Sequence, residues 1–213
     1  MISAFLLASC GDNGKEAVEA NYDVVPLPNE MTLSEGDAFI LTQATRIVYP
    51  EGNAKMQRNA EFLSEFLEIS TGRKLEVTSE YAARNAILLD IDGEIGQSEA
   101  YRITVKKDLI QITGADEAGV FYGIQTLRKA TPVGERISVA YAPVTINDAP
   151  RFGYRGTELD VARHFQPVAF IKKFIDMLAL HQINRFHWHL TEDQGCLPKI
   201  GRASCRKECR SRW

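Results

Sequence analysis

The chain has 213 residues, of which 45% are hydrophobic and 25% are charged, and its formal net charge is −3. This composition is typical of a globular protein with one good core or two small ones. The small negative charge gives no reason to expect a nucleic-acid partner. The sequence has no apolar run long enough to span a bilayer.

The first ten residues, MISAFLLASC, have the apolar run and small residues that end a secretion signal. Leu7-Ala8-Ser9-Cys10 resembles the lipobox of bacterial lipoproteins, in which the cysteine carries the lipid. That resemblance implies lipidation of Cys10 and a protein anchored in the bacterial cell envelope, in the periplasm or at the outer-membrane surface. The alternative is an ordinary signal peptide with a chance cysteine. Residues 1–23 are thus expected to be a signal remnant and a flexible polar tether.

Residues 24–148 alternate short strands with helices. The β-branched runs RIVY and AILLDI predict strands. Alternating apolar residues over 101–113 predict a hairpin that turns at Lys107-Asp108. We expect these elements to belong to a small α+β domain, in which we find no catalytic pattern.

Two helices are expected in the same domain, because apolar residues recur there at helical spacing. The first covers residues 55–71 and is expected to bury Met56, Ala60, Leu63 and Leu67, with Gly72 as its C-cap. The second covers residues 116–131 and is expected to bury Ala118, Phe121, Ile124 and Leu127.

A turn-rich stretch around Asp148, Pro150 and Gly153 predicts a domain boundary. After it, YRGTELD predicts a strand, residues 167–182 predict a helix, and INRFHWHL predicts a second strand. The helix has an apolar face formed by Val168, Ile171, Phe174, Ile175 and Leu178. A strand, a crossover helix and a second strand make a βαβ unit, the building block of barrels and doubly wound sheets.

The last stretch, residues 196–213, has a different composition. It is rich in arginine and contains Cys196, Cys205 and Cys209 without apolar periodicity. One C-x₃-C pair without nearby histidines offers too few ligands for a zinc site. We interpret these residues as artefactual or frameshifted sequence, and a basic binding tail is the alternative.

Five stretches together carry a family resemblance: PLPNEMTL, GVFYGIQTL, APRFGYRG, LDVARHF and NRFHWHLTEDQG. From about Val24 to Gly195 the chain resembles bacterial β-N-acetylhexosaminidases of glycoside hydrolase family 20. The resemblance implies a non-catalytic α+β N-terminal domain over residues 24–148. It also implies that residues 149–195 begin a (β/α)8 TIM barrel, of which this chain holds only the first βαβ portion.

The resemblance also implies an activity, the removal of terminal β-linked N-acetylglucosamine or N-acetylgalactosamine from glycans with retained configuration. In this family the substrate's own acetamido group is the nucleophile, an Asp orients it and the adjacent Glu is the general acid. We expect that Asp-Glu pair on a later barrel strand, outside this chain, so the chain itself should be inactive. Asp116-Glu117 opens a helix of the first domain, and Glu192-Asp193 has the reverse order. No cofactor is expected.

Three residues are candidates for the sugar pocket. Arg155 matches an arginine that hydrogen-bonds sugar hydroxyls in the family, and the alternative is an arginine paired to a structural carboxylate such as Asp160. Asp193 follows the second strand, at the end where the functional groups of barrel enzymes lie, so we expect it to be a pocket residue or a residue that supports one. The alternative is an acidic residue in a solvated loop. His189 is expected on the pocket wall, because alternation puts His187 and His189 on one face and Trp188 on the other.

Two other classes of protein remain alternatives. Metal-dependent amidohydrolases also carry His-x-His on a barrel strand, but on the first one, whereas a strand and a helix precede the pair here. Metal ligation by these histidines is therefore not our preferred interpretation. The third class is a lipoprotein that binds glycans without cleaving them.

Thr157-Glu158 departs from the family, which usually has apolar residues at these two positions. A carboxylate buried in a barrel wall needs a partner, because burying a bare charge is costly.

Overall fold

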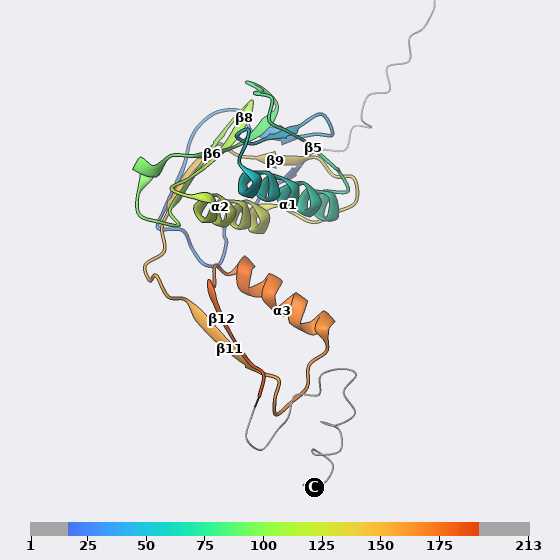
Figure 1. Ribbon diagram of the computed structural model, residues 1–213. Helices are drawn as coiled ribbons and strands as arrows, with labels where there is room; N and C mark the ends of the chain where they lie inside the picture. The colour runs from blue at the N-terminus through green and yellow to red at the C-terminus, as the bar shows by residue number, and fades with distance from the viewer. Residues whose placement is uncertain (1–16, 192–213) are drawn as a thin grey trace, which may run out of the picture. The chain divides into compact units, whose positions relative to one another are not determined.

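The computed structural model describes residues 17–191, and the chain divides between Ala149 and Pro150 into two compact units (Figure 1). The first unit contains the helices α1 (Ala54–Thr71) and α2 (Glu117–Ala130) and a short 3₁₀ turn, η1 (Gly93–Ile95). Its strands are β1 (Val18–Glu19), β2 (Glu30–Leu33), β3 (Phe39–Leu41), β4 (Arg46–Val48), β5 (Glu76–Thr78), β6 (Ala86–Ile91), β7 (Tyr101–Lys106), β8 (Leu109–Gly114), β9 (Val139–Tyr141) and β10 (Val144–Asp148).

The first unit is built on a seven-stranded mixed sheet in the order β2-β10-β7-β8-β6-β4-β5, with a smaller sheet in the order β1-β9-β3. Pairing in the large sheet is antiparallel from β2 to β8 and parallel from β8 to β5. Figure 1 shows α1 and α2 side by side on one face of this sheet. This helix-on-sheet packing is an α+β arrangement with one main core.

Helix α1 has both of the ends that its sequence predicts. The Asn53 side chain accepts hydrogen bonds from the backbone N–H groups of Lys55 and Met56, which caps the helix N-terminus. Gly72 ends the helix in the left-handed conformation at φ 70°, where glycine meets no Cβ penalty. The four residues expected on its buried face are all fully buried: Met56, Ala60, Leu63 and Leu67. The prediction for this helix is confirmed.

Helix α2 lies deeper in the unit than the sequence suggested. Ile124 and Leu127 are buried as expected, but Ala118 is exposed and Phe121 is only partly buried. The prediction was wrong at Ala118 because the helix packs along a wider face that includes Gly119 and Tyr122. Glycine at 119 permits an approach so close that an added Cβ would overlap the backbone carbonyl of Ala100.

The predicted hairpin is confirmed as β7 and β8, which pair antiparallel around a turn at residues 107–108. Alternate residues of β7 point into the core: Tyr101, Ile103 and Val105. Ile110 and Ile112 do the same from β8. Strict alternation fixes the register, because a slip by one residue would expose every one of these side chains.

The second unit contains β11 (Gly156–Asp160), helix α3 (Val168–Leu180) and β12 (Arg185–His189). Strands β11 and β12 are parallel neighbours, so the predicted βαβ unit is confirmed. The apolar face of α3 is buried only at Ile171, whereas Val168 and Ile175 remain exposed. Two strands offer too narrow a surface to cover the whole face of a helix of this length.

Among residues 17–191, no helix combines the length and the apolar character that crossing a membrane requires. Helix α1 has 18 residues, but its exposed face is mostly polar and charged. This finding concerns the described helices alone.

Candidate functional site

The two faces of the β11–β12 pair differ in chemistry. The parallel register sets Glu158 opposite His187 and Asp160 opposite His189, while Leu159 lies opposite Trp188. Side chains alternate along each strand, so the two carboxylates and the two histidines share one face. The other face carries Phe186 and Trp188, and the Phe186 ring packs against Phe174 of α3 at 5.6 Å between centroids. The polar face therefore points away from the helix.

Glu158 lies between the two histidines. Its Oε2 is 3.3 Å from Nδ1 of His187, and its Oε1 is 3.8 Å from Nδ1 of His189. The side chains of Glu158 and His187 are more than half exposed, at 55% and 61%, and that of His189 is 26% exposed. The carboxylate that the sequence flagged as out of place thus has imidazole partners on the neighbouring strand.

Asp160 ends β11 and holds the loop that follows. Its Oδ1 accepts hydrogen bonds from the backbone N–H groups of Ala162 at 2.9 Å and Arg163 at 3.0 Å. Its Oδ2 is 3.3 Å from Nε of Arg163. The bond from the Arg163 backbone, together with the other donors and the nearby charges of Arg163 and His189, holds the pKa of Asp160 below its usual range despite some desolvation.

Arg163 is a candidate that the sequence analysis missed. It follows the carboxyl end of β11, the end of a strand at which barrel enzymes gather their functional groups. Its guanidinium forms an ion pair with Asp160, and 65% of its side chain is exposed. Its position in the sequence could have indicated it, because Arg163 lies within LDVARHF, three residues after the last residue of β11.

Arg155 lies at the opposite end of the strand pair, just before β11 begins. Its Nε donates to the backbone carbonyl of Gln182 at 2.7 Å, and its Nη1 donates to that of Phe152 at 2.7 Å. Asp160, the carboxylate considered as its partner, is bound to Arg163 instead. This geometry favours a structural role for Arg155, and sugar binding by Arg155 stays a prediction.

His189, the third candidate, is the last residue of β12 and therefore lies at the carboxyl end of the pair. Asp193 lies outside the described residues, as do Cys10 and the stretch 196–213. Their expected roles stay predictions. Of the predicted pocket residues, the structure thus describes Arg155 and His189, at opposite ends of the two strands.

The one Asp-Glu neighbour pair in the sequence, Asp116-Glu117, has a structural place at the start of α2. Asp116 Oδ1 accepts a 2.8 Å hydrogen bond from the backbone N–H of Gly119, and its Oδ2 accepts one from Ser98 Oγ at 2.7 Å. Partial burial alone would raise the pKa of Asp116, but these bonds hold it below its usual range. A capping carboxylate with this many donors is a poor proton donor to a substrate.

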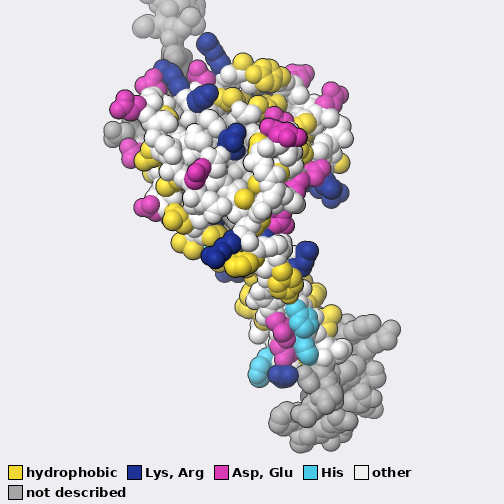
Figure 2. Space-filling view, turned by 90° about the vertical axis from the view of Figure 1, so that its left-hand side faces the viewer, with side chains coloured by type: hydrophobic (Ala, Val, Ile, Leu, Met, Phe, Trp, Pro, Cys, Tyr) yellow, Lys and Arg dark blue, Asp and Glu magenta, His cyan; other side chains and the backbone are white. Residues whose placement is uncertain are grey.

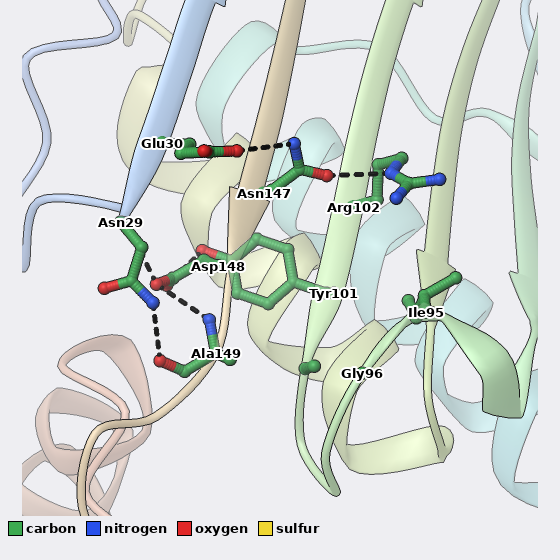
Figure 3. Close-up of a pocket in the computed structure, with 10 residues that line it drawn as sticks. Asn29, Glu30, Ile95, Gly96, Tyr101, Arg102, Asn147, Asp148 and Ala149 are labelled. Carbon is green, nitrogen blue, oxygen red and sulfur yellow. Dashed lines mark hydrogen bonds between the residues drawn. The ribbon is translucent and has the colours of Figure 1, made fainter.

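A hollow of about 410 Å³ lies at the edge of the first unit, where β10 ends (Figure 3). Figure 3 shows Glu30, Asn147 and Arg102 in a row across three strands, joined by two hydrogen bonds through Asn147. The Asp148 carboxylate accepts hydrogen bonds from Tyr101 Oη at 2.9 Å and from the backbone of Asn29 at 3.2 Å. These hydrogen bonds hold the last residues of β10 in place. Most of the polar side chains that line the hollow are thus hydrogen-bonded to one another.

The sequence matches two family descriptions, "Glycosyl hydrolase family 20, domain 2" over residues 21–149 and "Glycosyl hydrolase family 20, catalytic domain" over residues 152–203. The first match alone covers more than half of the chain. The chain therefore belongs to glycosyl hydrolase family 20.

Two relatives and one solved structure agree with this family. The chain is 36% identical over 200 residues to a beta-hexosaminidase of Porphyromonas gingivalis, covering 88% of this chain and 25% of that protein. It is 33% identical over 184 residues to a beta-hexosaminidase of Vibrio vulnificus, covering 86% of this chain and 20% of that protein. The structure is similar to that of Streptomyces plicatus N-acetyl-beta-hexosaminidase in complex with Thio-NAglucal, with a TM-score of 0.72 and 31% sequence identity. The match covers 81% of this chain and 35% of that chain. The chain thus spans about a fifth to a third of the length of these proteins.

Proposed function

We propose that this chain is part of a β-N-acetylhexosaminidase that removes terminal β-linked N-acetylglucosamine or N-acetylgalactosamine from glycans. The observation that carries the proposal is the match to family 20 over both units, with relatives that bear this name. In this proposal the first unit is a non-catalytic support. The second unit supplies the first two strands of a (β/α)8 barrel, of which this chain contains only the beginning.

The proposed reaction uses the substrate's acetamido oxygen as the nucleophile, so configuration is retained. It needs an Asp to orient the acetamido group and an adjacent Glu to protonate the leaving oxygen. Residues 150–191 contain no such neighbours, and we propose that the pair lies on later barrel strands. The described strands would contribute binding groups rather than the general acid.

Sugar contacts are proposed for groups at the carboxyl ends of the two strands. Arg163 is held there by Asp160, and 65% of its side chain is exposed. A guanidinium has several donors in a fixed geometry that suits adjacent hydroxyls. His189 ends β12, and Asp193, four residues further on, is proposed as a pocket residue. Arg155 stays in the proposal only as the less favoured arginine, because its donors reach backbone carbonyls at the other end.

The test is to express the reading frame that continues past residue 195 in the source DNA beside the 213-residue chain. Both are assayed with a chromogenic β-N-acetylglucosaminide. We expect turnover with retention in the longer protein and none in the 213-residue chain. Glycan binding without turnover in the longer protein would favour the non-catalytic glycan-binding lipoprotein. Cleavage of the acetamide without release of the chromophore, lost on chelation, would favour the metal-dependent amidohydrolase.

We also propose that Cys10 carries a lipid that anchors the protein to the membrane of the bacterial cell envelope, on the basis of the sequence Leu7-Ala8-Ser9-Cys10. Expressed with its full signal in a Gram-negative host, the protein should enter the membrane fraction and incorporate labelled fatty acid. Cys10→Ala should release it, with Cys205→Ala as the matched control. Equal partitioning of the wild type and Cys10→Ala would contradict the anchor.

A further inference from the structure

Three potential metal ligands gather on the polar face of the β11–β12 pair. Glu158, His187 and His189 each offer one ligand atom, and these atoms all lie within 4.8 Å of one another. Figure 2 shows histidine and acidic side chains together on the surface of the second unit. We infer that these three residues form a binding site for a divalent transition-metal ion such as Zn²⁺.

The spacing of the ligand atoms fits such an ion. Zinc binds nitrogen and oxygen ligands at about 2.0–2.2 Å in tetrahedral geometry, which puts neighbouring ligand atoms about 3.4 Å apart. Glu158 Oε2 and His187 Nδ1 are 3.3 Å apart, close to that value. Glu158 Oε1 and His189 Nδ1 are 3.8 Å apart. One ligand atom from each of the three residues lies within 4.8 Å of the other two, so side-chain rotation must shorten the wider separations when an ion binds.

The backbone fixes these three positions. Glu158 and His187 are direct partners in the parallel register, and His189 follows two residues later on the same face. On the opposite face of β12, the rings of Phe186 and Trp188 stack with 6.2 Å between their centroids. The pairing of the two strands therefore determines which three side chains face the ion.

The ligand set selects the class of ion. Two imidazoles and one carboxylate suit Zn²⁺, Co²⁺, Ni²⁺ and Cu²⁺, whereas Mg²⁺ and Ca²⁺ prefer oxygen ligands alone. In the 213-residue chain, the exposure of His187 and Glu158 leaves room for water in the remaining coordination position. Asp160 shares the face, but its oxygens already accept from the loop backbone and lie beside Arg163.

A bound ion would join β11 to β12, so the site acts as a cross-link between the two strands. A ligand that binds only the folded state stabilises it by mass action. The inference does not depend on the proposed hydrolysis, because metal binding is measured without substrate and without the missing catalytic pair.

The test is a Co²⁺ titration of the 213-residue chain after its cysteines have been alkylated, which removes competing thiolate ligands. We expect one equivalent to bind and to give the visible absorption bands of tetrahedral Co²⁺, and Zn²⁺ should displace it. Zn²⁺ should also slow tryptic cleavage within residues 150–191. An alkylated chain that binds no Co²⁺ would overturn the inference.

Variants assign the site. Loss of a residue that only orients a metal ligand weakens metal binding by about 10- to 100-fold. His187 is a proposed ligand itself, so His187→Ala should weaken Co²⁺ binding by at least about 100-fold. Glu158→Gln keeps the size of an exposed side chain, and thereby the fold, and should weaken binding by at least about tenfold. His164→Ala and His181→Ala remove the other two histidines and should bind as the wild type does. Equal binding by Glu158→Gln and the wild type, or loss of binding in His181→Ala alone, would overturn the assignment.

Discussion

The Arg155 guanidinium donates a 2.7 Å hydrogen bond to the backbone carbonyl of Gln182, in the loop that leads into β12. The backbone carbonyl of Arg155 in turn accepts hydrogen bonds from the N–H groups of Asn184 and Arg185. Arg155 thus ties the start of β11 to the start of β12. Because barrel substrates bind at the opposite ends of the strands, this relationship favours a structural role over sugar binding.

The first prediction follows from these bonds. In the longer protein proposed above, Arg155→Ala should lower the free energy of unfolding by about 2 kcal/mol, since hydrogen bonds from a charged donor to two carbonyls are lost. The value of KM for a β-N-acetylhexosaminide should stay near that of the wild type. Urea unfolding and steady-state kinetics measure both. Arg151→Ala, which removes an exposed neighbouring arginine, is the control.

A sugar contact would give the reverse result for Arg155→Ala. A kcat/KM lowered by about two orders of magnitude with unchanged stability corresponds to about 2–3 kcal/mol of lost transition-state binding. That outcome would establish the role implied by the family resemblance and contradict the structural one.

The second prediction concerns Gly119 in α2. Alanine normally stabilises a helix relative to glycine by about 1 kcal/mol, but a Cβ here would overlap the carbonyl oxygen of Ala100. Gly119→Ala should therefore destabilise the first unit by about 2 kcal/mol, the usual cost of overpacking. The control is Gly93→Ala, where an added Cβ meets nothing within 4 Å and the change should stay within about 0.5 kcal/mol. Equal melting temperatures for the two variants would contradict the packing at Gly119.

The third prediction concerns the pH dependence at Lys129. Burial lowers the pKa of its ammonium to about 8, although Nζ donates a hydrogen bond to the carbonyl of Val25. An unfolded lysine has a pKa of about 10.4, so between about pH 8 and 10.4 the unfolded chain binds more protons. Stability from this group should therefore rise with pH across that window, and its burial penalty is fully present below about pH 8.

Lys129→Met tests that sign. It should raise the free energy of unfolding at pH 7 by no more than about 1 kcal/mol, since the group is partly exposed and solvent screens it. It should also flatten the rise between about pH 8 and 10. Urea unfolding at pH 7 and 10 measures both effects, with Lys106→Met, at an exposed position on β7, as the control. The same slope in wild type and Lys129→Met would contradict the prediction.

Local elements were largely predictable from the sequence, because each is determined by nearby residues. The spacing of Met56, Ala60, Leu63 and Leu67 and the C-cap at Gly72 were sufficient to place α1. Alternation around Lys107-Asp108 was sufficient to place the hairpin. Ala118 was misplaced because helical spacing gives the period of a face but not its width, which the approach of Gly119 to Ala100 decides.

The candidate site was less predictable, because it depends on how two strands pair. The alternation of His187 and Trp188 was enough to predict that they lie on opposite faces of the strand. That Glu158 lies opposite His187 follows only from the register in which β11 pairs with β12. The role expected of Arg155 stays a prediction, and judging it requires knowing which end of the strand pair Arg155 occupies. Arg163 was overlooked because its place at the other end is also visible only in the paired strands. Strand order in the seven-stranded sheet also depends on contacts far apart in the sequence.

The last prediction concerns the unequal cores of the two units. In the described part of the second unit, the buried apolar residues are Val161 and Ile171, while Phe152 is 63% exposed and Tyr154 is 71% exposed. The first unit, by contrast, buries a large cluster around Phe39, Leu63 and Ile112. Regions with few buried apolar contacts open more readily and are cut first by proteases.

Limited trypsin digestion of the 213-residue chain should therefore cut early after Arg151, Arg163 or Lys172 and leave a protected fragment that ends close to Ala149. Mass spectrometry of the products over time identifies that end. The matched control is the exposed Lys55 in α1, a site of the same chemistry on the well-packed unit, which should be cut later. Early cleavage at Lys55, or a protected fragment that runs through residue 191, would contradict the prediction, because it would mean that the second unit is held as firmly as the first.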